Sequence, residues 1–252
     1  MNLRGVVKNA AVRAKLNRHP VIIGGCGRSG TTLLLAVLSA HPKFYCIPFE
    51  TYVLCPGAHE PRRRDPEAEL DPGRLFRIVP VQKILFSRRN RLCEKTPKNV
   101  VFFGGILKAF DERVRLVHIV RDGRDVITSR HPKRPGEYWT SPQRWIGDVS
   151  AGVEYMDHPC VSTIRYEDLI TDFDNTMESL LKEIGEDICE EVLSFTEHAT
   201  VRKGPWVNNP ELQGLYAGSI GRWRKEEHRE AVERFMRDPL AVSLLERLGY
   251  DI

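Results

Sequence analysis

No stretch of this sequence approaches the run of about 20 apolar residues that a helix needs to cross a bilayer. The longest candidate, Thr31 to Ala40, is half that length and directly follows a glycine-rich segment. The first 20 residues are basic and amphipathic but lack the apolar core of a signal peptide. We therefore expect a cytoplasmic protein without a membrane span, whose basic N-terminal segment forms a surface helix packed on the domain.

Cysteine is sparse as well. The six cysteines are scattered, with no C-x-x-C pair and no spacing typical of a zinc site. In a reducing compartment most of them should be free thiols, and we expect no metal site. The chain also lacks a Lys/Arg-rich tract interleaved with aromatic residues, so we do not expect it to bind nucleic acid.

The composition is that of an ordinary globular chain. Of 252 residues, 41% are hydrophobic and 29% are charged, which is enough apolar material for a sizeable core. The net charge of +4 suits an anionic ligand. We expect one α/β domain over residues 1–252, in which residues 1–19 are a basic N-terminal extension.

Short apolar runs alternate with helical patterns along the chain. The runs predicted as buried strands are Pro20–Gly25, Val114–Val120 and Pro159–Arg165. Helices are predicted at Thr31–Ala40, from Arg121 to about Ser129, and through most of the chain after Phe173. This alternation predicts a P-loop-like three-layer fold, with a central parallel sheet of about five strands flanked by helices.

Two stretches have the composition of long loops. The first, Pro56–Pro72, is rich in proline and charge, and the second, Val201–Gly218, is rich in Gly, Pro and Asn. Either stretch can be an inert surface excursion. Long loops of α/β folds also often cover the ligand at the carboxyl ends of the strands.

The segment Gly25–Thr32, Gly-Cys-Gly-Arg-Ser-Gly-Thr-Thr, carries the strongest functional signal. A tight loop between a buried strand and a helix aims backbone N–H groups and the positive end of the helix at one point, where a phosphate or sulfate can bind. The spacing resembles a Walker A loop, but Thr31 stands where that motif requires Lys, and the cation is Arg28 instead. No strand ends in an obvious aspartate for Mg²⁺, which disfavours a P-loop kinase. A glycine-rich turn without a ligand is the structural alternative.

Four segments together resemble the sulfotransferases that use 3′-phosphoadenylyl sulfate (PAPS). They are closest to the branch that contains protein-tyrosine sulfotransferases and their bacterial relatives. Residues 20–51 resemble the loop for the 5′-phosphosulfate, and Val120–Ser129 resembles the motif for the 3′-phosphate. The other two segments are Ile164–Leu169 and Gly218–Lys225.

The resemblance implies a set of residues that contact the donor. The 3′-phosphate contacts would be Arg121 and Ser129, with Lys133 as a further basic contact, and Tyr166 would contact adenine or phosphate. From the residues alone, Arg121 can instead pair with Asp122 or Asp125, Ser129 can be a surface serine, and Tyr166 can be a packing aromatic. The remaining implied donor contacts are Arg28, Ser29, Gly30, Thr31, Thr32, Ser219 and Arg222.

Three residues are candidates for catalysis. In the Glu50-Thr51 pair, Glu50 stands where the related enzymes carry a general base, although it can also be a surface glutamate of a loop. Lys95 matches a lysine that stabilises charge on the transferring group, and Arg28 would share this role. Of the histidines, His118 falls inside a buried strand and is predicted to be a core residue, while His41 before Pro42 is a helix-stop signal.

The resemblance implies transfer of a sulfuryl group from PAPS to an acceptor hydroxyl by in-line displacement, without a metal and with PAP as product. The acceptor can be a peptide tyrosine, a sugar, a lipid or a small natural product. The alternatives are a nucleotide or small-molecule kinase of the P-loop type, and a module that binds PAP without catalysis.

Cys46 and Cys93 each precede a catalytic candidate, so we expect them to lie close together. Related secreted enzymes link cysteines near these positions, whereas a cytoplasmic location favours thiols.

Overall fold

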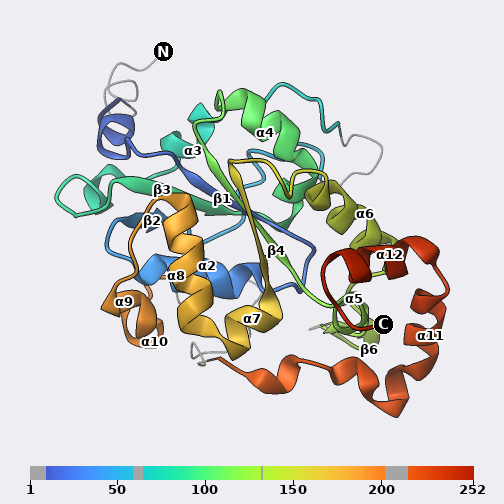
Figure 1. Ribbon diagram of the computed structural model, residues 1–252. Coiled ribbons are helices and arrows are strands. Elements are labelled where there is room, and N and C mark those ends of the chain that lie inside the picture. Colours follow the sequence, from blue (N-terminus) through green and yellow to red (C-terminus); the bar gives the residue numbers. More distant parts are fainter. Residues whose placement is uncertain (1–9, 59–64, 132, 202–214) are drawn as a thin grey trace.

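Five parallel strands form the centre of the computed structural model, which describes residues 10–58, 65–131, 133–201 and 215–252 (Figure 1). Their order across the sheet is β2-β3-β1-β4-β7, so the first strand lies in the middle. The strands are β1 (Val21–Gly24), β2 (Phe44–Cys46), β3 (Arg91–Lys95), β4 (Arg115–Val120) and β7 (Val161–Arg165). A separate antiparallel pair consists of β5 (Arg130–His131) and β6 (Arg134–Tyr138).

The continuous apolar runs of the central strands follow from burial on both faces of the sheet. Because successive side chains of a strand point to opposite faces, Val21 and Ile23 of β1 join one hydrophobic core, whereas Ile22 joins another. A strand covered on both faces has no solvent side for polar residues, which is why β1 and β4 lack an alternating pattern.

Helices cover both faces of the sheet. One core packs under α2 (Thr31–Ala40), α7 (Tyr166–Thr171), α8 (Phe173–Ile184), α9 (Glu190–Leu193) and α10 (Phe195–His198). The opposite core includes a helical turn at residues 10–15, α3 (Gly73–Arg77), η2 (Pro97–Phe102) and α4 (Phe103–Ala109), with the 3₁₀ turn η1 (Val81–Lys83) beside it.

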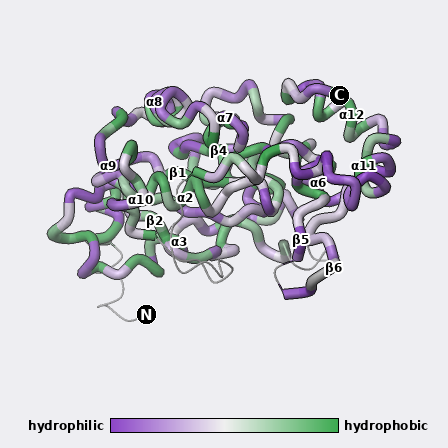
Figure 2. The backbone as a smooth tube through the Cα atoms, turned by 90° about the horizontal axis from the view of Figure 1, so that it is seen from below, coloured by the Kyte–Doolittle hydropathy of each residue, from purple (hydrophilic) through white to green (hydrophobic). Residues whose placement is uncertain are grey.

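A third core lies beyond the carboxyl end of β4. It packs α5 (Gly123–Ile127), α6 (Pro142–Val153), α11 (Arg229–Met236) and α12 (Pro239–Arg247) around buried Trp145. Three 3₁₀ turns lead to α11: η3 (Ala217–Ser219), η4 (Arg222–Arg224) and η5 (Glu226–His228). Figure 2 shows hydrophilic colour along α11, on the outside of the molecule.

Local signals in the sequence explain where the main helices begin and end. Helix α2 starts after Gly30, which has φ 93°, and ends at His41 before Pro42. Helix α8 ends at Gly185, whose φ of 85° is the left-handed conformation that glycine adopts without strain. The side chain of Ser141 accepts the Arg144 N–H at the start of α6, and Pro142 follows at the first helical position.

The predicted fold class is confirmed, including the parallel sheet and its five strands. The predicted N-terminal surface helix is confirmed for the described residues, since Val12 and Leu16 of that segment are buried in the core. Strands β2 and β3 and the β5–β6 pair were not identified individually in the sequence. Of the two predicted loops, residues 59–64 and 202–214 lie outside the described residues. Among the helices of the described residues, none is long and apolar enough to cross a membrane.

Candidate active site

The predicted phosphate loop joins the end of β1 to the start of α2, at the carboxyl edge of the sheet. Two of its glycines are required by their surroundings. A Cβ atom on Gly25 would lie 2.4 Å from the Ile119 carbonyl oxygen, and one on Gly30 would lie 2.4 Å from the Tyr166 ring. Gly30 also has a φ of 93°, which other residues adopt only with strain. The glycines therefore fit the loop tightly between β4 and α7.

The loop presents polar groups that fit an anion. The first N–H groups of α2 have no partner within the helix and add its partial positive charge at this point. The Ser29 hydroxyl is buried, and it finds no hydrogen-bond partner in the part of the chain that the structure describes. A buried donor without a partner is costly, and an oxygen of a phosphate or sulfate would satisfy it.

Arg28 occupies the most unusual backbone position of the loop, with a φ of 77°. Its side chain is exposed, while its carbonyl oxygen accepts a hydrogen bond of 3.1 Å from Arg121. The pKa of the Arg28 guanidinium is lowered, first by its partial burial and then by the charges of Arg121 and Arg222. Three arginines thus converge here, and their mutual repulsion would be relieved by a bound anion.

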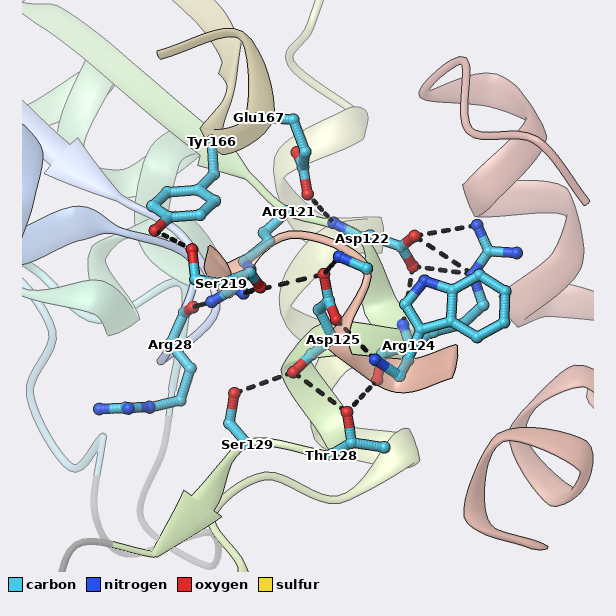
Figure 3. Close-up of polar contacts among 12 residues, drawn as sticks. Arg28, Arg121, Asp122, Arg124, Asp125, Thr128, Ser129, Tyr166, Glu167 and Ser219 are labelled. Carbon is cyan, nitrogen blue, oxygen red and sulfur yellow. Dashed lines mark hydrogen bonds and ion pairs between the residues drawn. The ribbon is translucent and has the colours of Figure 1, made fainter. Parts of the chain in front are cut away.

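Arg121 and Ser129 flank α5, as Figure 3 shows. The Ser129 hydroxyl donates to the Asp125 carbonyl oxygen at 2.9 Å, and Arg121 Nη2 lies 3.8 Å from the carboxylate of the same residue. Arg121 Nη2 also donates to the carbonyl oxygen of Ser219, whereas its buried Nε has no partner in the described part of the chain. The guanidinium therefore keeps an unused donor beside the phosphate loop.

Tyr166 and Ser219 also contact Arg121. The Tyr166 hydroxyl and the Ser219 hydroxyl are 2.7 Å apart, and the Arg121 guanidinium stacks 4.5 Å from the centre of the Tyr166 ring. The three residues come from α7, η3 and the end of β4, which are far apart in the sequence (Figure 3). Their contacts bring together three of the four segments on which the family resemblance rests.

Asp125 holds the segment Gly218–Lys225 in place, a role that its sequence position did not reveal. Its carboxylate is buried and accepts the backbone N–H groups of Gly221 and Trp223 at 2.8 and 3.0 Å. The segment thereby places Ser219 against Tyr166, and Arg222 close enough to Arg28 to affect its pKa.

Glu50 and Lys95, predicted from separate motifs, form an ion pair of 2.7 Å. Their side chains are 15% and 6% exposed, so the pair is largely buried and Glu50 is its more accessible member. The Tyr52 hydroxyl donates to the other carboxylate oxygen of Glu50 at 2.5 Å. The pKa of Tyr52 is raised, first by burial and then by its bond to Glu50. In the parallel pairing of β1 and β3, Lys95 stands opposite Ile23, shortly before the phosphate loop begins.

A fully buried carboxylate, Glu94, positions the backbone beside this pair. Glu94 accepts the Thr51 hydroxyl at 2.9 Å, the Thr96 hydroxyl at 2.6 Å and the Asn99 amide at 2.7 Å. The pKa of Glu94 is raised by burial, against which these hydrogen bonds act. The sequence interpretation overlooked Glu94, because a glutamate inside a short strand carries no pattern of its own.

Arg144, from α6, is a further cation that the sequence interpretation missed. A Cβ atom on Gly27 would lie 3.2 Å from Arg144 Nη2 and 3.5 Å from the indole nitrogen of Trp139. The Asp148 carboxylate lies 3.6 Å from Arg144 and 2.5 Å from Lys98. The loop at Gly27 is thus lined by an arginine and an indole N–H, both from residues near the start of α6.

Lys133 and the two cysteines complete the predicted positions. Lys133 is exposed between β5 and β6, and its backbone N–H donates to His131, so its role in donor binding stays a prediction. Cys46 and Cys93 stand opposite each other in the pairing of β2 and β3, which confirms that they lie close together, and both are free thiols. The remaining members of the loop, Thr31 and Thr32, form the first turn of α2. Within the described ranges, no cluster of three or more His, Cys, Asp or Glu side chains is arranged to hold a metal ion.

Comparisons with known proteins agree with this arrangement. A model described as the sulfotransferase family matches residues 20–190. An uncharacterized protein of Aquifex aeolicus (strain VF5) is 25% identical over an alignment of 254 positions, which covers 88% of this chain and 32% of that protein. The chain therefore spans about a third of the length of this relative.

Three solved structures are similar in fold. The sulfotransferase domain of the Synechococcus PCC 7002 olefin synthase is 19% identical, with a TM-score of 0.61, covering 93% of this chain and 97% of that one. A sulfotransferase from Alicyclobacillus acidocaldarius is 15% identical, with a TM-score of 0.54, covering 93% and 97%. Mouse sulfotransferase SULT7A1, solved in complex with PAP, is 15% identical, with a TM-score of 0.52, covering 94% and 92%. At these identities the likeness shows a shared fold.

Proposed function

The chain belongs to the sulfotransferase family, and on that premise we propose that it transfers a sulfuryl group from PAPS to an acceptor hydroxyl. The similar mouse enzyme was solved with PAP, the product that this reaction leaves. The buried Ser29 hydroxyl and Arg121 Nε, which have no partner among the described residues, support the fit of such a donor, because both atoms need an acceptor oxygen. A cytoplasmic location remains part of this proposal.

We assign protein contacts to each part of the donor. The 5′-phosphosulfate would lie on the phosphate loop, against the backbone of Ser29, Gly30, Thr31 and Thr32 and under the Arg28 side chain. The 3′-phosphate would lie between Arg121 and Ser129, whose side chains both contact Asp125. The adenosine would contact Tyr166, Ser219 and Arg222, with Lys133 as a further basic contact.

The observation that carries the proposal is the ion pair of Glu50 and Lys95 beside the phosphate loop. Glu50 would accept the proton of the acceptor hydroxyl as the new oxygen–sulfur bond forms. The bond between sulfur and the bridging oxygen of the donor breaks in line, and its electron pair leaves with PAP. Lys95 and Arg28 would stabilise the negative charge that develops on that oxygen.

A labelled-donor experiment tests the proposal. The protein is incubated with ³⁵S-labelled PAPS and an extract of its host, and the labelled product is identified. Transfer of label, unchanged in EDTA, is expected if backbone N–H groups and Arg28 supply the positive charge that Mg²⁺ supplies in a kinase. Transfer that EDTA abolishes and Mg²⁺ restores would instead support the P-loop kinase, and tight PAP binding without any labelled product would support a binding module. The product also identifies the acceptor among peptide tyrosine, sugar, lipid and small natural product.

A further inference from the structure

A tight turn with an apolar corner projects from the chain just before β3. The Ser87 N–H donates to the Ile84 carbonyl oxygen at 3.1 Å, which makes Leu85 and Phe86 the two corner residues of the turn. Ile84 is fully buried, whereas Leu85 is 40% and Phe86 is 97% exposed. Turn corners in water are normally Gly, Pro, Asn, Asp or Ser. A leucine and a phenylalanine at this position indicate that the turn meets an apolar environment.

The chain around this turn carries positive charge alone. Between Asp71 and Glu94 there are six basic residues and no acidic one. They are Arg74, Arg77, Lys83, Arg88, Arg89 and Arg91. Lys83 and Arg88 flank the turn and are exposed, and Arg89 donates to the Lys83 carbonyl oxygen at 3.3 Å, which closes the base of the turn. The turn therefore has apolar residues at its tip and cations at its base.

The part of the sheet edge beside this turn, where β1, β2 and β3 begin, adds further cations. Arg18, Lys43 and Arg91 all contact the buried carboxylate of Glu186, at 3.2, 2.8 and 3.0 Å, so three cations share one anion. The pKa of His19 is lowered, first by burial and then by Arg115, Arg91, Arg113 and Arg18. The backbone ties this edge to the turn, since the Arg18 N–H donates to the Asn90 carbonyl oxygen at 3.2 Å.

This surface and the candidate active site occupy opposite edges of the sheet. All pairings of the five strands are parallel, so the strand starts share one edge, and the phosphate loop, Lys95 and Arg121 follow the strand ends at the other. In Figure 1 the N-terminal helical turn and α3 lie at the end of the molecule away from α5 and β6. A partner bound at the strand starts would leave the active site open.

We propose that the turn Ile84–Ser87 inserts Leu85 and Phe86 into the interfacial region of an anionic lipid bilayer. Lys83 and Arg88, together with the partly exposed Arg18 and Lys43, then contact the lipid headgroups. A bilayer fits better than a nucleic acid because the most exposed residue of the turn is apolar and its cations lie behind it. The protein binds reversibly at the membrane surface, because one Phe and one Leu bury too little apolar area for permanent anchoring.

Vesicle sedimentation with the full chain tests this proposal. The vesicles consist of phosphatidylcholine alone, or of phosphatidylcholine with one third phosphatidylglycerol. We expect binding to the anionic vesicles only, lost at high salt. Leu85→Ser/Phe86→Ser and Lys83→Gln/Arg88→Gln should each lower the partition coefficient at least about tenfold. The matched controls, Leu240→Ser on exposed Leu240 and Arg234→Gln/Arg237→Gln, should leave it unchanged.

A second measurement reports insertion directly. Because the chain already has four tryptophans, the emission of the parent protein is subtracted from that of each variant. The difference emission of Phe86→Trp should shift to the blue with anionic vesicles and be quenched by brominated acyl chains, whereas that of Leu240→Trp should show neither effect. No binding to anionic vesicles would overturn the proposal. So would binding that depends on Lys83 and Arg88 but not on Leu85 and Phe86, which would point to a polyanion such as nucleic acid instead. Because Phe86 is exposed, its variants should keep the thermal unfolding temperature of the parent, and a variant that does not is replaced by the single substitution Phe86→Ser.

Discussion

At the scale of single residues, the two carboxylate oxygens of Glu50 have different partners. One accepts Lys95 at 2.7 Å and the other accepts the Tyr52 hydroxyl. Tyr52 has a φ of 53°, and Thr51 beside it is bonded to buried Glu94. Because Thr51 is bonded to a buried carboxylate and Tyr52 is bonded to Glu50 itself, the position of Glu50 is fixed more firmly than in an ordinary surface loop.

Replacing Glu50 with Gln tests its role as the base. Glu50→Gln keeps the shape and most hydrogen-bonding reach but removes the proton affinity, so the rate of transfer should fall by roughly 10²–10⁴-fold. The affinity for PAP should change little, since Glu50 faces the acceptor in the proposed mechanism. Single-turnover transfer and PAP titration give the two values. The matched variant Glu67→Gln, at an exposed position, should alter neither. A folded Glu50→Gln protein with the parent rate would move the base to another residue.

Arg121 is expected to distinguish PAP from 5′-AMP. Arg121→Ala removes the guanidinium from the proposed 3′-phosphate site, at a cost of about 1.5–3 kcal/mol for each charged hydrogen bond lost. Affinity for PAP should therefore fall toward that for 5′-AMP, which itself should change less. Calorimetric titration of both nucleotides measures the ratio, with Arg113→Ala at an exposed position as control. If the variant prefers PAP by the parent margin, the 3′-phosphate binds elsewhere.

At the scale of elements, the phosphate loop depends on its contact with α7. Gly30 ends the loop in a left-handed conformation, and the Tyr166 ring occupies the space where a side chain would begin. The ring is held in turn by the Ser219 hydroxyl and by the Arg121 guanidinium. A change at Gly30 should therefore reach the proposed adenosine contacts through Tyr166.

A pair of glycine substitutions separates this effect from helix propensity. Gly30→Ala should destabilise the fold by at least about 1–2 kcal/mol, the cost of a left-handed non-glycine residue, and should weaken PAP binding. Gly147→Ala is the control, because Gly147 lies inside α6 with no atom within 4 Å of a new Cβ. There alanine should stabilise by roughly 0.5–1 kcal/mol and leave PAP binding unchanged. Urea unfolding and PAP titration measure both variants, and equal effects at the two positions would contradict the proposed packing role.

At the scale of the whole molecule, the sequence predicted the three strands that lie within longer apolar runs, and it missed the three-residue strand β2 and the charged strand β3. β1, β4 and β7 fall within the predicted runs. β3 was not predicted because it contains three charged residues, Arg91, Glu94 and Lys95, all of which are buried. Arg91 pairs with Glu186, Glu94 accepts the Asn99 amide, and Lys95 pairs with Glu50. All three partners lie outside β3. Such pairing depends on the order of the strands, which no local pattern encodes.

The same limit applies to the candidate site. The glycine loop was identified because its spacing reflects a local backbone path, and Gly25 and Gly30 meet the contacts that such a path implies. Asp125 and Arg144 were missed as parts of the site, because their roles arise from segments that meet only in the folded chain. Asp125 bonds backbone N–H groups nearly a hundred residues away, as the separations of 96 and 98 residues show. Family resemblance supplied Glu50 and Lys95, and the fold brings the two into contact.

The stability of the molecule should depend on pH through His118 at the centre of the sheet. The residue is fully buried on β4 against Gly152, and neither ring nitrogen has a partner in the described part of the chain. Burial lowers the pKa of His118 from 6.5 to about 4. Between these pH values the unfolded chain binds a proton that the folded chain excludes, so stability falls as the pH drops below 6.5. Buried Glu94 acts in the opposite direction, because its pKa is raised, and its contribution to stability is lost as the pH rises through that raised value.

His118→Leu isolates the histidine from the other titrating groups. The lowered pKa of His118, about 4 against 6.5 in the unfolded chain, corresponds to a loss of about 3 kcal/mol of unfolding free energy by pH 4. The variant should lack this part of the acid dependence, whatever its stability at pH 8, because leucine takes up no proton. Urea unfolding of both proteins at several pH values from 8 to 4 gives the difference between their free energies of unfolding. That difference should be constant above pH 7 and should shift in favour of the variant as the pH falls. A difference that stays constant to pH 4 would mean that the folded protein admits the proton, through water or a neighbouring acceptor that reaches the ring.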